Sequence, residues 1–247
     1  MYQSKITIWS NRSTDDRKVL IVSPKGGKLV HTNKYDVRTK YQKITGKYNI
    51  SSKGAINADI EISNSGKLYN KKYYLEFEKN EDQVIYYKNQ FSNLLDVDIL
   101  KINFVNDKES IIFKESISLK ASNYAEVLNN EMMLKLNAFN TFNHLPKRYS
   151  NRIHPIEITN GFKDEDEIII TIPKNYRINQ LPDAIKLENE FGEYSFQVEK
   201  INAYELRYKR TLILFETTHS KNVYSKFRSF LTKINKNDKQ KIILSKI

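Results

Sequence analysis

The sequence contains no cysteine among its 247 residues. Disulfide bonds, zinc sites built from thiolates and catalysis by a cysteine nucleophile are therefore excluded for these residues. The absence of cysteine does not indicate a compartment, because such a chain is stable in oxidising and reducing surroundings alike.

Long apolar runs are also missing. No stretch of the sequence approaches the roughly 18 apolar residues that a membrane-spanning helix needs. Residues 1–18 lack the apolar core of a secretory signal peptide. We therefore expect no transmembrane segment and no signal peptide in this sequence, and its localisation stays undetermined.

Glycine is scarce, with 7 residues, whereas the chain has 16 tyrosines and 12 phenylalanines. Aromatic and β-branched residues favour the half-buried surface of a β-sheet. Hydrophobic residues make up 39% and charged residues 28% of the chain, a balance typical of globular proteins. A chain of this length can bury one large core or two ordinary ones.

Lysine and arginine outnumber aspartate and glutamate, and the formal net charge is +12. A strong positive charge is compatible with an acidic partner such as an anionic lipid, an anionic envelope polymer or a nucleic acid. It also follows from a composition rich in lysine, asparagine and isoleucine. No motif in the sequence favours a nucleic acid, so we do not expect one as the partner.

The first half begins with a predicted hairpin, formed by the apolar run at 18–23 and the segment at 28–32. The glycines between them resemble a phosphate-binding loop. That loop requires serine or threonine after its lysine, and Leu29 stands there instead, so we predict an ordinary turn. Further turns are predicted at Gly46 and Gly54.

The periodicity of the next segments alternates between that of strands and that of a helix. Residues 55–63 carry an apolar side chain at every second position, which predicts an antiparallel strand with one solvated face. Residues 79–93 have apolar side chains at three- and four-residue spacing, which predicts a helix. Strands are also predicted at 4–9, 97–105 and 110–121.

Residues 124–139 fit two interpretations. As a helix, the segment would bring Val127, Met132 and Leu136 to one side. As a hairpin, it would turn at Asn129 and Asn130, and asparagine tolerates the positive φ angle that such a turn requires. We favour the hairpin.

The second half is punctuated by prolines. A buried strand at 167–173 stops at Pro173, and a short strand at 176–182 stops at Pro182. The acidic segment 160–167 is predicted to be a solvated turn, and three alternating runs between 184 and 216 predict three further strands. A strand is predicted to close the chain at 239–247.

These patterns together predict a mainly β protein built of antiparallel, β-sandwich-like modules. One helix is expected in the first half, and residues 223–234 predict an amphipathic C-terminal helix. The polar, asparagine-rich segment 137–151 is predicted to be a linker. We therefore expect two β-rich domains, residues 1–136 and residues 152–247.

Recognisable catalytic or metal-binding patterns are absent from the sequence. The four histidines lie in separate segments without metal-ligand spacing, and no G-x-S-x-G nucleophile turn is present. The acidic run 164–167 offers oxygen atoms for calcium but lacks the spacing of a calcium loop. We predict no catalytic residues, no metal site and no cofactor; carboxylate-based hydrolysis stays the weakest alternative.

The C-terminal segment is strongly basic. Lys226, Arg228 and Lys233 lie on the polar side of the predicted helix and are candidate ligands for an anionic polymer or envelope surface. The alternative is an ordinary surface helix that covers one end of a sheet.

The order of prolines, aromatics and arginines in the second half is similar to a known pattern. R-x-x-P is followed by P-x-x-Y-x-x-x-x-x-P, then by G-x-Y, then by a helix with Y-x-x-F. This pattern resembles the C-terminal region of unknown function, DUF3858-like, of Bacteroidetes transglutaminase-like proteins. The residues that carry it are Arg152, Pro155, Pro173, Tyr176, Pro182, Gly192, Tyr194, Tyr224 and Phe227, with Arg210 between the last two groups.

The resemblance extends to the start of the chain, where residues 17–30 are similar to the segment that follows the transglutaminase core of those proteins. It implies that the motif residues are structural, and that the Cys, His and Asp of the core would lie upstream of Met1. The expected function is a non-catalytic accessory domain whose partner is a transglutaminase-like core protein. The relatives resemble exported envelope proteins.

Overall fold

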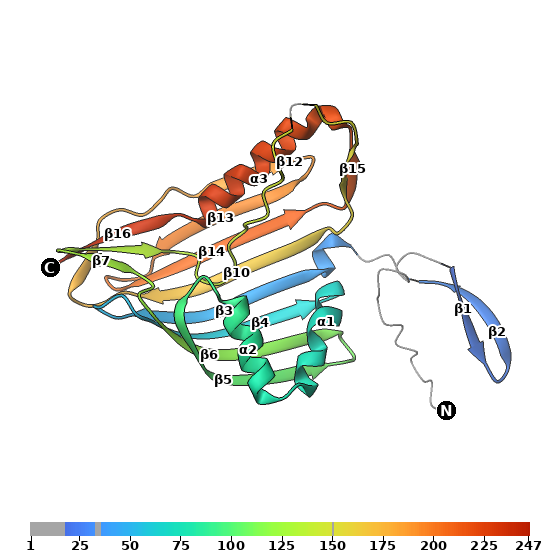
Figure 1. Cartoon of the computed structure of the whole chain (residues 1–247), viewed down its shortest axis with the longest axis horizontal. Coiled ribbons are helices and arrows are strands. Elements are labelled where there is room, and N and C mark those ends of the chain that lie inside the picture. Colours follow the sequence, from blue (N-terminus) through green and yellow to red (C-terminus); the bar gives the residue numbers. More distant parts are fainter. Residues whose placement is uncertain (1–17, 33–35, 150) are drawn as a thin grey trace.

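The computed structural model describes residues 18–32, 36–149 and 151–247, and the strand predicted at 4–9 lies outside them. Its central feature is an eight-stranded sheet with the order β12-β13-β14-β10-β3-β4-β6-β5 (Figure 1). All neighbours are antiparallel except β3 and β10, which are parallel. The strands are β3 Tyr41–Ile50, β4 Ile56–Ser65, β5 Leu95–Asp107, β6 Ile112–Ser122, β10 Phe162–Thr171, β12 Ile185–Asn189, β13 Gly192–Lys200 and β14 Glu205–Leu214.

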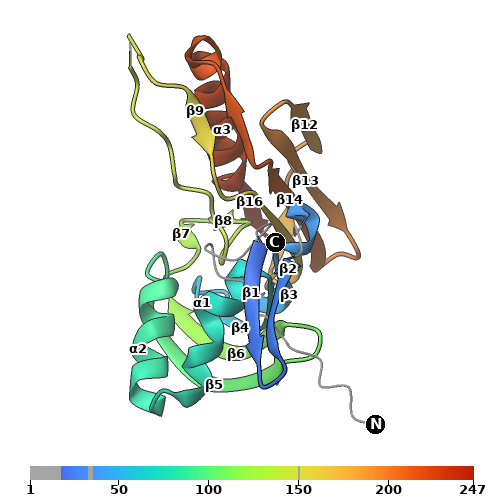
Figure 2. The same cartoon turned by 90° about the vertical axis from the view of Figure 1, so that its right-hand side faces the viewer.

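One face of this sheet carries the core because apolar side chains recur at every second position. In β4, Ile56, Ala58, Ile60 and Ile62 are buried, while the intervening side chains are more exposed, as the alternation predicts. The helices cover this face (Figures 1 and 2). α1 Lys67–Lys72, the 3-10 helix η2 Tyr73–Phe77 and α2 Asn80–Gln90 cover one end, and α3 Tyr224–Asp238 covers the other.

Smaller sheets complete the fold. β11 Tyr176–Ile178, β16 Lys241–Lys246, β8 Glu131–Lys135 and β7 Glu126–Leu128 form a four-stranded sheet in that order. β9 Ile156–Ile158 pairs with β15 Thr217–His219, and β1 Lys18–Ser23 pairs with β2 Gly26–His31. Two further 3-10 turns, η1 Val37–Thr39 and η3 Lys221–Val223, begin at side-chain caps from Asp36 and Ser220.

The mainly β class, the antiparallel majority and both helical regions are confirmed. The helix expected at 79–93 is α2, and the one expected at 223–234 is α3. The hairpin interpretation of residues 126–135 is also confirmed, since Asn129 has a φ of 54° between β7 and β8. The helical turns at 67–77 were not expected. Within the described part of the chain, no helix is long and apolar enough to cross a membrane.

The turn predicted at Gly46 is wrong, because β3 continues through this residue. The glycine instead allows a close approach between strands: a Cβ atom at Gly46 would lie 2.2 Å from the Asp59 carbonyl oxygen of β4. Glycine within a strand often marks such an approach rather than a turn.

The turn predicted at 160–167 is also wrong over most of its length. β10 begins at Phe162, so the acidic residues 164–167 are part of a central strand. β14 pairs with this segment on one side and β3 on the other. This pairing brings carboxylates toward the core, with consequences for the site described below.

The eight-stranded sheet combines strands from both halves of the sequence. β3, from the first half, lies beside β10, from the second. The segment 137–149 lies against the body, where Phe139 contacts the rings of Tyr48 and Phe91. The division into domains 1–136 and 152–247 stays a prediction about folding units.

Candidate functional site

A cluster of charged side chains is buried between β10, β14 and α3. Arg210 of β14 stands directly opposite Asp166 of β10, and its Nη1 atom lies 3.1 Å from Asp166 Oδ2. The Nε and Nη2 atoms of Arg210 donate to the two carboxylate oxygens of Asp238 over 2.7 and 2.8 Å. Such two-pronged pairing makes a guanidinium–carboxylate contact both strong and directional.

Other polar groups complete this Arg210 cluster. The Tyr194 hydroxyl donates to Asp238 Oδ1 over 2.8 Å, and the backbone N–H of Phe142 donates to Asp238 Oδ2 over 2.8 Å. Asn140 Nδ2 lies 3.2 Å from Asp166 Oδ1. The cluster therefore connects three strands, the end of α3 and the segment 140–142.

Burial determines the proton affinities in the cluster. It raises the pKa of Asp166 to about 6, although the adjacent Arg210 acts in the opposite direction. Burial alone would lower the pKa of Arg210, but Asp166 and Asp238 outweigh it and raise that pKa above its usual range. Burial also raises the pKa of the Tyr194 hydroxyl, which stays protonated and donates to Asp238.

Sequence reasoning identified Arg210 and Tyr194 as motif residues but missed their acidic partners. The burial of Asp166 could have been predicted from the sequence, because Asp166 continues the two-residue spacing of the buried Ile168 and Ile170. Glu165 and Glu167 belong to the opposite face of the strand. The carboxylates of 164–167 thus do not converge on one calcium ion, and the described residues include no group of three or more metal-ligand side chains that could hold a metal.

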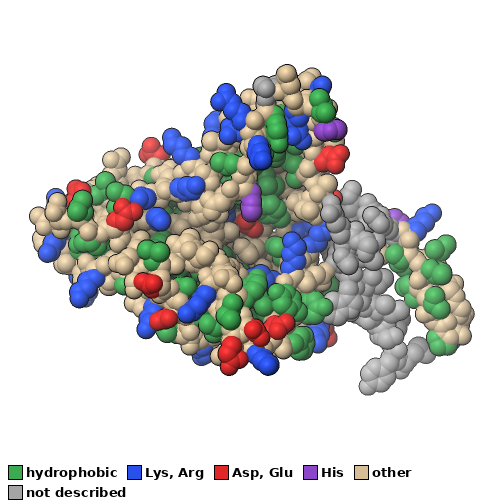
Figure 3. All heavy atoms as spheres, viewed as in Figure 1, with side chains coloured by type: hydrophobic (Ala, Val, Ile, Leu, Met, Phe, Trp, Pro, Cys, Tyr) green, Lys and Arg blue, Asp and Glu red, His purple; other side chains and the backbone are tan. Residues whose placement is uncertain are grey.

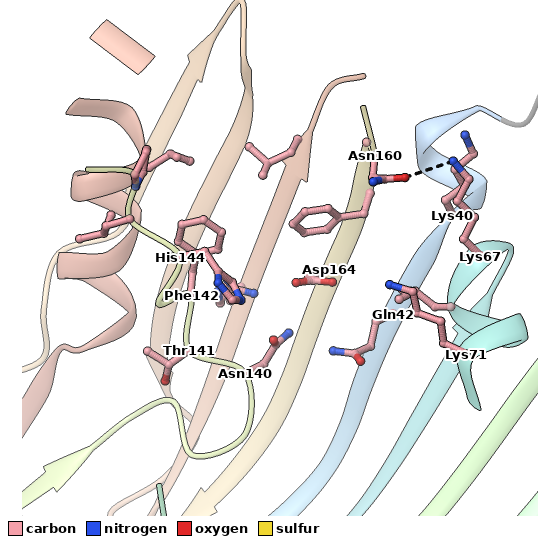
Figure 4. A pocket seen from close by; sticks show the side chains of 18 of the residues that line it. Lys40, Gln42, Lys67, Lys71, Asn140, Thr141, Phe142, His144, Asn160 and Asp164 are labelled. Carbon is pink, nitrogen blue, oxygen red and sulfur yellow. Dashed lines mark hydrogen bonds between the residues drawn. The ribbon is translucent and has the colours of Figure 1, made fainter. Parts of the chain in front are cut away.

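A cleft of about 1270 Å³ opens beside the Arg210 cluster (Figure 4). Its floor is formed by β14, β10 and β3, through side chains that include Leu214, Phe162, Asp164 and Gln42. One wall comes from α1, and the opposite wall comes from α3 and the segment 140–146. The same face is visibly hollowed in the space-filling view, with lysine or arginine atoms at its border (Figure 3).

Asp164 lies at the centre of the cleft floor, between Gln42 and Asn140 (Figure 4). Burial raises the pKa of its carboxyl to about 7, and the nearby Asp166 and Asp238 contribute to the increase while Arg210 opposes it. Lysines and arginines of the described ranges make no ion pair with Asp164. It is therefore a carboxyl group that titrates near neutral pH and faces open space.

The walls of the cleft differ in chemistry. On the α1 side, Lys67 Nζ lies 3.4 Å from the Asn160 side-chain oxygen, and Lys71 is exposed. Lys40 forms an ion pair with Glu216 at 3.3 Å. On the α3 side, the ring of Phe227 packs edge-on against Phe191, with centroids 5.1 Å apart.

Several motif residues anchor the segment before β9. The Arg152 guanidinium lies over the Tyr224 ring, 4.6 Å from its centroid, and donates to the carbonyl oxygens of His154 and Pro155. The Tyr224 hydroxyl donates to the Lys147 carbonyl oxygen. These contacts hold Lys147 and residues 152–155 against the start of α3.

The remaining motif residues lie at strand ends. Pro173 follows β10, and its carbonyl oxygen accepts a hydrogen bond from the backbone N–H of Tyr176, whose side chain is buried. Pro182 separates β11 from β12. Gly192 begins β13 where a Cβ atom would lie 2.0 Å from the Ile213 carbonyl oxygen, so a larger residue would not fit.

The predicted anion-binding residues are only partly available. Lys226 Nζ contacts both Glu190 carboxylate oxygens at 2.8 Å, and Arg228 Nε donates to the Pro146 carbonyl oxygen over 3.2 Å. Lys233 is exposed. Anion binding by these residues stays a prediction, because two of them already have partners within the chain.

A second buried polar cluster surrounds Glu115, and sequence reasoning missed it as well. Glu115 accepts hydrogen bonds from the Tyr87 hydroxyl and from Asn64 Nδ2, and Lys72 Nζ lies 3.4 Å from its carboxylate. The cluster connects α1 and α2 to β4 and β6 under the helices. It is away from the cleft opening and serves the packing of this end of the sheet.

Comparison with known proteins places part of the chain in a family. Residues 130–244 match the model of DUF3858, described as a domain of unknown function with a solved structure. The match begins at the turn before β8 and ends in β16, and it includes all the motif residues named above. A search of curated proteins found no match.

Among solved structures, the chain is similar to one described as a "putative protease" from Parabacteroides distasonis ATCC 8503. The sequence identity is 16% and the TM-score is 0.35, and the match covers 40% of this chain and 19% of that chain. The matched region is thus less than a fifth of that protein. Residues 130–244 of the chain form a DUF3858 domain.

Proposed function

We propose that the chain is a non-catalytic accessory domain that binds a transglutaminase-like core protein. The DUF3858 match supports it, since residues 130–244 include the pattern on which the resemblance to such proteins rests. The observation that carries the proposal is a hairpin with exposed apolar side chains at the start of the described chain.

The hairpin formed by β1 and β2 pairs with no other described strand, and Figure 1 shows it away from the eight-stranded sheet. Leu20 and Leu29 face each other across it and are 61% and 68% exposed, and Val22 is 77% exposed. An isolated two-stranded hairpin is at best marginally stable in water. An exposed apolar surface of this kind is typical of a protein interface.

The charges of the hairpin indicate what its partner presents. Residues 18–32 contain lysines at 18, 25 and 28 and no acidic residue. The hairpin therefore fits an apolar surface with acidic residues at its rim. Its sequence resembles the segment that follows the core in transglutaminase-like proteins, which supports such a core as the partner.

The polar groups of the fold support a non-catalytic role. Arg210, Asp166 and Asp238 bond to one another, as a structural cluster would.

The proposal is tested by the affinity of the purified chain for a purified transglutaminase-like core from the same organism, measured by calorimetry. We expect binding in the micromolar range, weakened at least about tenfold by Leu20→Lys with Leu29→Lys. Leu100→Lys with Ile153→Lys changes two exposed apolar residues elsewhere and serves as the matched control. Equal binding by both variants, or no binding by the unmodified chain, would contradict the proposal.

Catalysis is tested separately. The purified chain alone should show no transamidase or protease turnover. Turnover that persists through purification and disappears with Asp164→Asn would contradict the non-catalytic role, because Asp164 is the half-buried carboxyl that faces the cleft.

A further inference from the structure

The cleft beside the Arg210 cluster presents three kinds of chemistry to one occupant. Its floor is acidic at Asp164, its α1 wall is basic, and its α3 wall is apolar (Figure 4). Ligand pockets commonly have volumes of roughly 300–1,000 Å³, so a cleft of about 1270 Å³ has room for several linked groups.

Above about pH 7, where Asp164 is ionised, the floor holds more negative than positive charge. Asp164, Asp166 and Asp238 lie close enough to influence one another, and Arg210 is the cation among them. The three guanidinium nitrogens of Arg210 bond to Asp166 and Asp238, so they are already engaged. The surplus charge therefore belongs to Asp164, which is the carboxylate that faces the cleft (Figure 4). A cationic group on a ligand would neutralise it.

The basic wall restricts the charge on the rest of the ligand. Lys67 and Lys71 are four positions apart on α1 and line the cleft from the same side. A polyamine or another purely cationic ligand would be repelled by them, and a purely anionic ligand would be repelled by Asp164. A ligand with separate positive and negative groups satisfies both.

The apolar wall supplies the third requirement. Phe142, Leu145, Phe227 and Leu231 line the side opposite α1. They favour an apolar group between or beside the charged ones. Amide side chains of Gln42, Asn140 and Asn160 also reach the cleft and match the donors and acceptors of peptide bonds.

We propose that this cleft binds a short peptide segment, with a side-chain ammonium group at Asp164, a carboxylate at Lys67 and Lys71, and an apolar side chain against Phe227 and Leu231. The ammonium group offers three donors, and Asp164 with the adjacent amide side chains accepts them. The site does not depend on the hairpin, so it is tested on the chain alone.

The probe is acetyl-glutamyl-leucyl-lysine amide, titrated into the isotopically labelled chain and followed by NMR. We expect shifts at cleft residues and a dissociation constant of about 1 mM or lower, the range for a ligand of this size. Acetylation of the lysine amine removes the charge and should weaken binding about tenfold. Glutaminyl in place of glutamyl should weaken binding several-fold.

Two variants connect the probe to the proposed contacts. Asp164→Asn should weaken the lysine probe about tenfold and leave the acetylated probe unchanged, whereas Asp183→Asn, at an exposed site outside the cleft, should change neither. Lys71→Gln should weaken the glutamyl probe but not the glutaminyl one, with the exposed Lys174→Gln as its control. A retained NMR spectrum of each variant shows that it folds.

Three outcomes would overturn the proposal. One is the absence of shifts at cleft residues with about 20 mM probe, well above the expected constant. Another is equal affinity for the acetylated and free-amine probes. The third is unchanged affinity in Asp164→Asn. None of them bears on binding of the hairpin to a core protein, so the two proposals fail separately.

Discussion

Arg210 holds two buried carboxylates that come from distant parts of the sequence, Asp166 in β10 and Asp238 at the end of α3. Buried ion pairs of this kind contribute little net stability when complete, but removing one partner leaves uncompensated charge in the core. The residue is therefore expected to matter for folding rather than for a reaction.

Replacing Arg210 tests this role. Arg210→Met should lower the free energy of unfolding by about 3–5 kcal/mol, because Asp166 and Asp238 would stay buried without their cation. Tyr194→Phe removes one hydrogen bond to Asp238 and should cost about 1 kcal/mol. Urea denaturation measures both, with the exposed Arg177→Met as the control. A loss below about 1 kcal/mol for Arg210→Met would contradict the structural role.

Asp164 should make stability depend on pH. Folding raises the pKa of its carboxyl from 3.8 to about 7, so the folded state favours the protonated form. The destabilisation is absent well below pH 3.8, grows as pH rises from there toward 7 and is nearly complete above about pH 7. Burial is the main cause of the raised pKa; Arg210 opposes it, and Asp166 and Asp238 add to it.

Asp164→Asn removes this titration. At pH 8 the variant should be more stable than the unmodified chain by about 1–2 kcal/mol, after allowance for solvent at the cleft. At pH 4 the two should be nearly equal. Urea unfolding at both pH values measures the difference. A variant that is no more stable than the unmodified chain at pH 8 would show that folding does not raise the pKa of Asp164.

At the scale of single elements, the sequence correctly predicted the strands, helices and hairpin that local residue patterns determine. Alternation identified β4, three- and four-residue spacing identified α2 and α3, and the asparagine pair identified the hairpin between β7 and β8. The errors at Gly46 and at the acidic start of β10 share a cause. Glycine and a charged run each predict a turn when they are considered without their neighbours. In the fold, Gly46 allows the close approach of β4, and Asp166 is buried against Arg210 of β14. Neither pairing is visible in the local pattern of the segment itself.

Gly192 shows the same dependence on a neighbour. A Cβ atom there would meet the Ile213 carbonyl oxygen of β14, so Gly192→Ala should lower the free energy of unfolding by about 2–3 kcal/mol. Gly27→Ala is the control, because its new methyl group meets the flexible end of Leu20. Thermal unfolding distinguishes the two, and equal melting temperatures would contradict the close approach at Gly192.

At the scale of the whole molecule, the sequence predicted the class but not the arrangement. The parallel pairing of β3 with β10 joins residues more than a hundred positions apart, and local periodicity carries no information about such partners. For the same reason the cleft was not predicted: it requires β3, β10, α1 and α3 to be placed beside one another. Motif residues such as Arg210 and Tyr194 were recognisable, but their acidic partners became visible with the fold.

The hairpin of β1 and β2 is the proposed contact surface for a transglutaminase-like core. Hydrogen–deuterium exchange of the chain, alone and with the purified core, tests this contact. We predict fast amide exchange within residues 18–31 in the free chain, because an isolated hairpin opens readily, and strong slowing there when the core is bound. Slow exchange in the free chain, or protection by the core that omits these residues, would contradict the claim.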